Sequence, residues 1–411
     1  MSDPVAGQRE ANRILILLMF SVGINYIDRG ALSISAPLLT RELALSPAQL
    51  GLLFSGFFWT YSMLQPLAGW LVDRYNVTRV FGAGYLLWSL ATGSMAWIHQ
   101  FSALFGARLV LGAGESVAYP AYSQILVRHF PENRRGVANS LLEAAAKIGP
   151  AISTLIGGLL VARFGWRALF LCLGIVSLSW LIPWILWGPT VGSSATKTEG
   201  SRVSVAQIMR RREAWGTSLD MFALGYVWSF LLSWLPTYLV NERGFSLRMV
   251  AVLGSLPFWA MAGTAVFGGW LSDRWIASGG SVTRVRKTFM NAGLLTCGVT
   301  LLPAAAVHDA TTAMVLLIIS SAALGLFTSN VWAVTQTLAG PRAAGSWTGI
   351  QNAVGNLGGV LSPYLTGLIV GQTGSYYLAF AACSLVIVAG VASYATLVGE
   401  IRPLDWADGH R

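Results

Sequence analysis

Long runs of hydrophobic residues dominate the chain and follow one another with only short polar segments between them. Most runs are longer than a core helix of a soluble domain needs, and about 20 apolar residues are enough to cross a bilayer as a helix. Gly and Ala recur inside the runs, which suits close helix packing in lipid. The pattern predicts an all-α membrane protein with twelve transmembrane helices, at residues 12–36, 47–70, 78–98, 101–127, 136–162, 167–188, 214–240, 247–271, 287–306, 311–338, 344–369 and 373–398.

Composition and charge fit a chain that lies mostly in the membrane. Of its 411 residues, 55% are hydrophobic and 11% are charged, whereas roughly a quarter of the residues in a soluble domain carry charge. The net charge of +10 would suit nucleic acid only if the basic residues formed one patch. Nineteen of the 27 Lys and Arg residues lie instead in loops on one side of the predicted spans and five on the other, so both termini and residues 189–213 are expected in the cytoplasm. We expect a multi-pass protein of a bacterial inner membrane, in contact with the lipid bilayer and with no nucleic acid.

The chain contains an internal repeat. With an offset of 200 residues, 69–74 (GWLVDR) falls on 269–274 (GWLSDR), and Ser46 falls on Ser246. Repeats related about an axis along the membrane normal are a mark of secondary transporters, whose substrate binds near the midplane between the repeats. The repeat predicts two pseudo-symmetric halves of six helices each. Their expected bounds are 1–188 for the N-terminal bundle, 189–213 for a cytoplasmic linker and 214–411 for the C-terminal bundle.

A few charged residues lie inside the predicted spans, where a charge costs roughly 2.5–3.5 kcal/mol on insertion scales and commonly marks a functional path. Three of the 27 Lys and Arg residues are among them: Arg29, Arg108 and Lys147. Arg108 and Glu115 are seven residues apart, so they share a helix face but are too distant for a tight bond. This spacing suits a relay in which protonation of Glu115 or Asp28 releases an arginine to hold an anionic substrate.

A structural role is the alternative for these residues. Asp28 and Arg29 are adjacent, about 100° apart on a helix, so each needs its own partner. Either could form an ion pair that ties the first span to the fourth, and Arg108 could brace the first half through a network. The planar guanidinium of Arg29 also matches a carboxylate in a bidentate way that lysine cannot, which favours substrate binding.

A second charged pair lies in the span 136–162. Glu143 and Lys147 are spaced i,i+4 with the acid first, which is the stabilising order. They form either a self-neutralising pair or part of the site, in which Lys147 binds a second carboxylate of the substrate while Glu143 sets its charge and takes part in proton coupling. Asp220, near the start of the span 214–240, is expected at the membrane interface.

The signature Gly-x-x-x-Asp-Arg at 69–74, repeated at 269–274, resembles that of the major facilitator superfamily. More narrowly, the chain resembles the anion:cation symporter family, which includes bacterial galactonate and hexuronate transporters, animal sialin and vesicular glutamate transporters. The resemblance covers essentially the whole chain. It implies the major facilitator fold, and it is carried by Arg108 followed by Glu115 and by the stretches 25–29 (NYIDR), 58–61 (FWTY), 129–132 (HFPE) and 233–239 (SWLPTYL).

This resemblance implies roles for residues of the first half. Asp28 and Glu115 correspond to proton-titrating carboxylates, and Arg29, Arg108 and Tyr61 correspond to residues that line the anion site. The stretch 144–147 (AAAK) departs from the family, which has small polar residues there.

In the second half, the resemblance implies that Ser329 and Asn352 contact substrate and that Tyr226 faces the cavity. The repeated signature is expected at the cytoplasmic ends of the helices, where its charged residues can hold one conformation closed. The residues assigned to this gating role are Asp73, Arg74, Asp273 and Arg274.

The function that these observations favour is proton-coupled import of a small organic anion, such as a sugar acid or another carboxylate, by a monomer that needs no cofactor and uses protons as its coupling ion. Anion uniport or exchange is an alternative that the same residues allow. A proton-driven exporter fits less well, because Gly149-Pro150 is not followed by the Gly-Gly spacing that such exporters have. An enzyme is not expected, since the sequence has no metalloprotease, nucleophile-elbow or P-loop motif.

Overall fold

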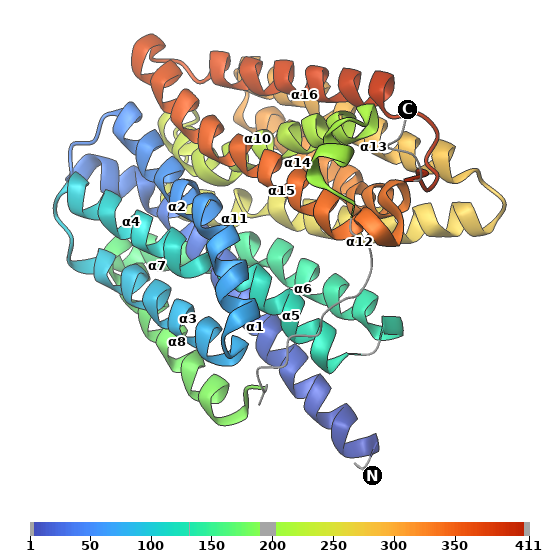
Figure 1. Cartoon of the computed structure of the whole chain (residues 1–411). Helices are drawn as coiled ribbons and strands as arrows, with labels where there is room; N and C mark the ends of the chain where they lie inside the picture. Colours follow the sequence, from blue (N-terminus) through green and yellow to red (C-terminus); the bar gives the residue numbers. More distant parts are fainter. Residues whose placement is uncertain (1–3, 131, 190–202, 407–411) are drawn as a thin grey trace. The chain divides into compact units, whose positions relative to one another are not determined.

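The computed structural model describes residues 4–130, 132–189 and 203–406, and this part of the chain consists of helices joined by short turns (Figure 1). The helices are α1 (Pro4–Glu42), α2 (Pro47–Arg74), α3 (Val77–Ser94), η1 (Met95–Trp97), α4 (Phe101–Glu115), α5 (Ala118–His129), α6 (Glu132–Ile152), η2 (Ser153–Gly157), α7 (Gly158–Phe164), α8 (Trp166–Trp187), α9 (Val205–Met209), α10 (Arg212–Asn241), α11 (Leu247–Leu253), α12 (Leu256–Ala277), α13 (Val282–Ala306), α14 (Ala310–Thr328), α15 (Val331–Thr373) and α16 (Tyr377–Leu397).

Ten helical segments in the described part are long and apolar enough to cross a membrane. They coincide with ten of the predicted spans, and the remaining two predictions, 47–70 and 78–98, are occupied by α2 and α3. The chain is therefore the multi-pass helical membrane protein that its hydrophobic runs predict.

Several predicted spans are interrupted rather than straight. The span 101–127 breaks between α4 and α5, and the span 136–162 passes through the π-helical turn η2 three residues after Pro150. A proline inside a helix removes a backbone donor and promotes such irregularities. Gly340 has φ 61° and interrupts α15 between the predicted spans 311–338 and 344–369. This left-handed conformation suits glycine because it has no Cβ.

The repeat seen in the sequence recurs in helix capping. The Ser46 side chain accepts a hydrogen bond from the Gln49 backbone N–H at 3.2 Å, at the start of α2. In the second half the Ser246 side chain accepts from the Met249 N–H at the same distance, at the start of α11. Equivalent residues thus begin equivalent helices.

A similar contact recurs in helix packing, between threonines that are 204 residues apart and not 200. The Thr60 hydroxyl of α2 donates to the Leu109 carbonyl of α4 at 2.7 Å, and the Thr264 hydroxyl of α12 donates to the Ala322 carbonyl of α14 at 2.7 Å. Both helix pairs therefore pack through an interhelical threonine bond, as two copies of one bundle should.

Packing divides the chain into two compact units. The first contains residues 1–197 and 235–255, and the second contains residues 198–234 and 256–411. The last residues of α10, together with α11, thus group with the first unit, where α11 packs on α7. Ala251 of α11 lies so near Gly158 that a side chain at Gly158 would collide with it. The predicted linker 189–213 lies mostly outside the described residues.

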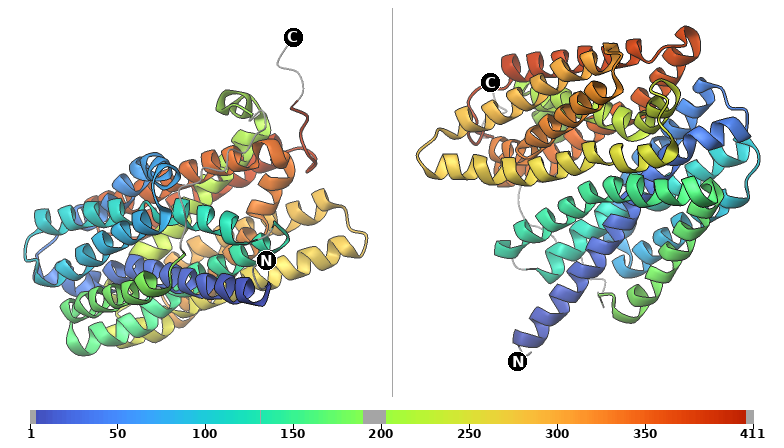
Figure 2. Two further views of the ribbon diagram at one scale, coloured as in Figure 1. Left: turned by 60° about the horizontal axis from the view of Figure 1, so that its bottom comes forward. Right: turned by 180° about the vertical axis from the view of Figure 1, so that it is seen from behind.

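The long helices of each unit run side by side (Figures 1 and 2). In the first unit, α3 and α8 are joined by buried aromatic rings, and Tyr85 stacks on Trp180 with ring centroids 4.2 Å apart. In the second unit, the Asp309 carboxylate caps α14, accepting from the Thr312 N–H at 2.7 Å and from its hydroxyl at 2.6 Å. These two bonds lower the pKa of the Asp309 carboxyl.

Candidate functional site

An ion pair between Arg29 and Glu115 forms the centre of the first unit. Arg29 Nε donates to Glu115 Oε2 at 3.0 Å, and the two side chains are 9% and 0% exposed. The pair joins α1 to the last residue of α4. This is the tie between the first and fourth spans that the sequence left open as an alternative, and it makes Glu115 the partner of Arg29.

Three aromatic rings surround the Arg29 guanidinium. Its Cζ lies 4.8 Å from the centroid of Tyr26, 4.9 Å from Phe57 and 4.7 Å from Tyr61. Aromatic faces attract a cation, and more strongly where water is excluded. Tyr61 therefore belongs to the environment of the Arg29 guanidinium, together with Tyr26 and Phe57.

Arg108 lies beside this centre but does not pair with Glu115. Its Nε donates to the Leu53 carbonyl at 3.2 Å, and its Cζ lies 5.2 Å from the Phe57 ring. Arg108 Nη1, Arg29 Nη2 and Glu115 Oε1 are buried and have no hydrogen-bond partner. Two guanidinium groups therefore keep donors available near one carboxylate, as an anion-binding site requires.

Asp28 is buried at 2% exposure on a different face of α1. It forms no ion pair with any described residue, and neither of its carboxylate oxygens has a hydrogen-bond partner. Glu115, the partner of Arg29, also lies within electrostatic range of Asp28, whereas the hydroxyls near Asp28 come from Thr92 and Ser177. Only Arg29 has a charged partner at bonding distance.

Glu143 and Lys147 form the expected i,i+4 pair, with Lys147 Nζ 3.5 Å from Glu143 Oε2. The pair is more exposed than Arg29–Glu115, because Glu143 is 42% and Lys147 21% exposed. Glu143 also lies within electrostatic range of Tyr26 and Tyr119, whose hydroxyls are 3.0 Å apart. Tyr26 thus connects the Arg29 environment to the second charged pair.

The predicted substrate contacts of the second unit lie in different surroundings. Tyr226 is buried and packs near the Phe222 ring, and Asn352 is half-buried on α15. The Ser329 hydroxyl donates to the Leu326 carbonyl at 2.6 Å and accepts from Asn330. Ser329 also packs against Gly268 of α12, one residue before the repeated signature. These residues bring no charged group to the second unit's interior.

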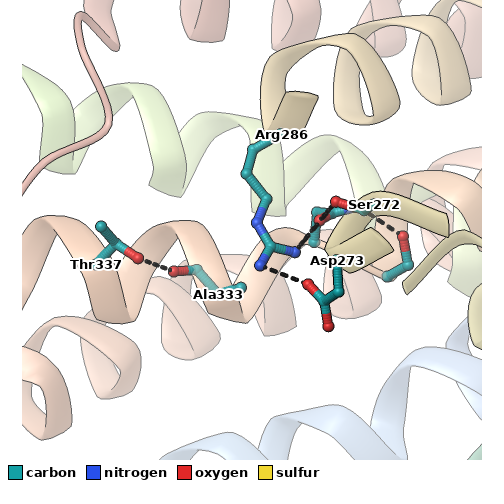
Figure 3. Close-up of polar contacts among 7 residues, drawn as sticks. Ser272, Asp273, Arg286, Ala333 and Thr337 are labelled. Atoms are coloured by element: carbon teal, nitrogen blue, oxygen red, sulfur yellow. Dashed lines mark hydrogen bonds and ion pairs between the residues drawn. The ribbon is translucent and has the colours of Figure 1, made fainter. Parts of the chain in front are cut away.

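The repeated signature organises a polar cluster in the second unit. Asp273 Oδ1 is 2.9 Å from Arg286 Nη2 of α13, and Arg286 Nη1 donates to the buried Asn330 side chain and to Ser272. Figure 3 shows Arg286 reaching Asp273 and Ser272 together. Of the other residues predicted to gate, Arg74 and Arg274 lie over the rings of Trp70 and Trp270, at 5.7 and 5.3 Å. The Asp73 side chain is outside the described residues.

Arg286 connects Asp273, Ser272 and Asn330. The sequence does not distinguish it from the other basic residues of the loops. Its position at the start of the span after the signature, in a cluster of basic residues 284–287 (RVRK), was the available signal. Asp220, which is expected at the membrane interface, is 2% exposed and therefore buried within the second unit. It lies beside Gly390 of α16, where the absence of a side chain leaves room for the carboxyl group.

Comparison with known proteins places these features in a family. The family model of the Major Facilitator Superfamily matches residues 18–363. The chain is 32% identical to a probable sulfoacetate transporter of Cupriavidus necator, covering 98% of this chain and 96% of that protein. It is 30% identical to the hexuronate transporter of Bacillus subtilis, covering 95% and 94%. The crystal structure of a bacterial homologue of the human lysosomal transporter Spinster, inward-facing and occupied, matches with a TM-score of 0.79 at 19% identity over 93% and 95% of the chains. The likeness confirms the predicted fold.

Proposed function

The chain belongs to the Major Facilitator Superfamily, a family of transporters and not of enzymes, and on that basis we propose that it is a proton-coupled symporter that imports a small organic anion by alternating access. Its location is the bacterial inner membrane with both termini in the cytoplasm, and a monomer carries out transport. The substrate is anionic, in keeping with relatives named for sulfoacetate and hexuronate.

The observation that carries the proposal is the environment of Arg29. Three aromatic ring centroids lie within 5 Å of the Arg29 Cζ atom and Glu115 neutralises its charge, while Nη2 has no hydrogen-bond partner. A substrate carboxylate or sulfonate can accept hydrogen bonds from Arg29 and from the nearby Arg108. The two arginines lie next to the same Phe57 ring, and we propose that one anion binds both.

Proton coupling follows from competition for Arg29. While Glu115 is ionised it occupies the guanidinium, so an anionic substrate competes with a carboxylate already in place. Protonation of Glu115 removes that competitor, and the substrate anion replaces it as the partner of Arg29. Proton and substrate therefore bind together, which is the requirement for symport.

Asp28 provides a second protonation site near Arg29 and Arg108. With two protons, import of a monoanion moves one net positive charge inward. A potential of 100 mV then contributes about 2.3 kcal/mol, or roughly fifty-fold accumulation. Lys147 binds the second acidic group of a dianionic substrate, and Glu143 partly neutralises the charge of Lys147 through their 3.5 Å contact.

The experiment is uptake into liposomes containing the purified protein. A panel of sulfoacetate, glucuronate, galactonate, glucarate and tartrate is screened for proton entry when an inward gradient of each acid is imposed. We expect one acid to drive proton entry in liposomes that contain the wild-type protein. The same acid should drive no proton entry in liposomes that contain Arg29→Ala or Asp28→Asn. If Asp28→Asn still exchanges internal for external molecules of that acid, Asp28 is needed for proton coupling and not for substrate binding. Proton movement with none of the acids, accompanied by efflux of cationic dyes, would refute the proposal.

A further inference from the structure

A polar cluster lies in the first unit around Asp28 of α1, which is not part of the Arg29–Glu115 ion pair. Asp28 is 2% exposed, and its neighbours Thr92 of α3 and Ser177 of α8 are 1% and 0% exposed. Both hydroxyls lie close to the Asp28 carboxylate. Helices α1 and α3 both pack on α8, so three helices meet at this carboxylate.

The geometry of these groups is unusual for a buried cluster. Neither oxygen of Asp28 has a hydrogen-bond partner, and the hydroxyl oxygens of Thr92, Ser177 and Tyr85 have none either. The side chains are therefore adjacent but not aligned to bond one another directly. Buried polar groups without partners are rare and call for a bridging ligand, since each such group costs free energy.

Helix geometry explains why these residues converge. Tyr85 and Thr92 are seven residues apart on α3 and share one face, and Ser177 and Trp180 are three apart on α8 and also share a face. Tyr85 stacks on Trp180, which brings the two faces together, and the Tyr85 phenol lies within range of both Asp28 and Ser177. The hydroxyls are thus held around the carboxylate by ring packing.

We infer that Asp28, Thr92 and Ser177 bind ordered water, and that this water delivers the proton to Asp28 from the side of α1 that faces α3 and α8. A bound water needs about two to four polar partners, and one carboxylate with three surrounding hydroxyls supplies them. A water molecule can donate to both oxygens of Asp28 and accept from the Thr92 and Ser177 hydroxyls, which makes four hydrogen bonds. The inference rests on the proposed proton coupling.

The charged and titratable groups facing Asp28 are few. From α4 they are Glu115 and Arg108, and from α3 there is Tyr85. The described neighbour from α8 is Ser177, which does not titrate. Thr92 and Ser177 are therefore positioning residues: they hold the water that reaches Asp28 and touch neither the Arg29 guanidinium nor the substrate.

The test separates proton-coupled uptake from exchange in liposomes, using the acid of the panel that drives proton entry in the wild type. In Thr92→Val/Ser177→Ala, we expect net uptake driven by a pH gradient to fall about tenfold, as loss of a positioned proton-transfer group predicts. Exchange of labelled for unlabelled substrate at equal pH should stay within about twofold of wild type, because it needs no net proton transfer. The single variant Thr92→Ser keeps a hydroxyl at position 92 and should show net uptake like that of the wild type.

Two controls keep the outcomes distinct. Ser89→Ala, on α3, removes a buried hydroxyl that donates to the Tyr85 carbonyl at 2.7 Å, and it should leave net uptake unchanged. Equal loss of uptake and exchange, or wild-type uptake in the double variant, would overturn the inference while leaving symport intact. Uptake that depends on Na⁺ at constant pH and is lost in Thr92→Val would overturn the inference, because it would show that the cluster binds a cation and not water. Absence of proton entry in the wild type would instead refute the proposed function.

Discussion

Arg29 of α1 and Glu115 of α4, 86 residues apart in the sequence, form a buried ion pair with Nε and Oε2 3.0 Å apart. A buried pair of this kind is weak evidence for stability, because desolvation offsets much of the attraction. Removing one partner is costly, however, since the other charge is left without compensation. The pair is therefore well suited to a change of partner, in which a substrate anion takes the place of Glu115.

Glu115→Gln should uncouple transport without abolishing it. The amide keeps the shape of the carboxyl group but cannot exchange a proton, so net uptake driven by a pH gradient is lost while substrate exchange remains. The uncompensated Arg29 charge should also lower the unfolding temperature, and saturating substrate should restore part of that loss. Parallel flux and thermal unfolding measurements check both effects, and unchanged pH-driven uptake contradicts the assignment.

Arg29→Lys should weaken substrate binding about tenfold, equivalent to about 1.4 kcal/mol. The ammonium group keeps the charge but loses the planar fork that lies among three rings and can bind a carboxylate through two nitrogens. The matched control is Arg163→Lys, an exposed arginine 5.2 Å from the Phe164 ring, which should bind substrate normally. Equal affinity in Arg29→Lys and wild type, measured by equilibrium binding, contradicts this role.

Arg286→Ala should destabilise the second unit by about 1–2 kcal/mol, because the buried Asn330 side chain and Ser272 lose a charged donor. Asp273→Asn should cost less, under about 1 kcal/mol, since Asp273 is 70% exposed and water screens its ion pair. Thermal unfolding of the two variants compares them directly. A larger loss in Asp273→Asn would show that the ion pair, and not the Asn330 contact, dominates the cluster.

Asp220→Asn should raise the unfolding temperature. Asp220 is buried and forms no ion pair with a described residue, so ionisation in this place is unfavourable. A gain of about 1 kcal/mol corresponds to roughly 2–4 °C for a unit of this size. Asp309→Asn is the control, because Asn caps a helix as well as Asp does. A fall in the unfolding temperature of Asp220→Asn would indicate a partner that the ionised carboxylate needs.

Much of the fold could be predicted from periodicity and length, since helices that span lipid must be long and apolar. The offset of 200 residues located helix starts at Ser46 and Ser246 that are capped alike. The break at Gly340 falls in the gap predicted between the spans 311–338 and 344–369. The irregularity at η2 could not be predicted, because prolines also occur in spans that remain continuous. Helix irregularity depends on packing partners that a single sequence does not reveal.

The candidate site was predictable in its members but not in its pairing. The rarity of charge in apolar runs selects Arg29, Arg108 and Glu115, and the i,i+4 spacing predicts the Glu143–Lys147 contact. Which arginine takes Glu115 depends on how α1 rotates against α4, and no local pattern encodes that rotation. The roles of Thr92 and Ser177 could not be predicted from the sequence, because uncharged polar residues are common in membrane helices.

The central claim, that substrate displaces Glu115 from Arg29 once Glu115 is protonated, is tested most directly by counting protons during binding. Calorimetric titration of substrate into the purified protein, in buffers of different ionisation enthalpy, gives the number of protons taken up for each anion bound. We predict net proton uptake in the wild type and one proton fewer in Glu115→Gln. Proton uptake of the same size in both proteins would contradict the account.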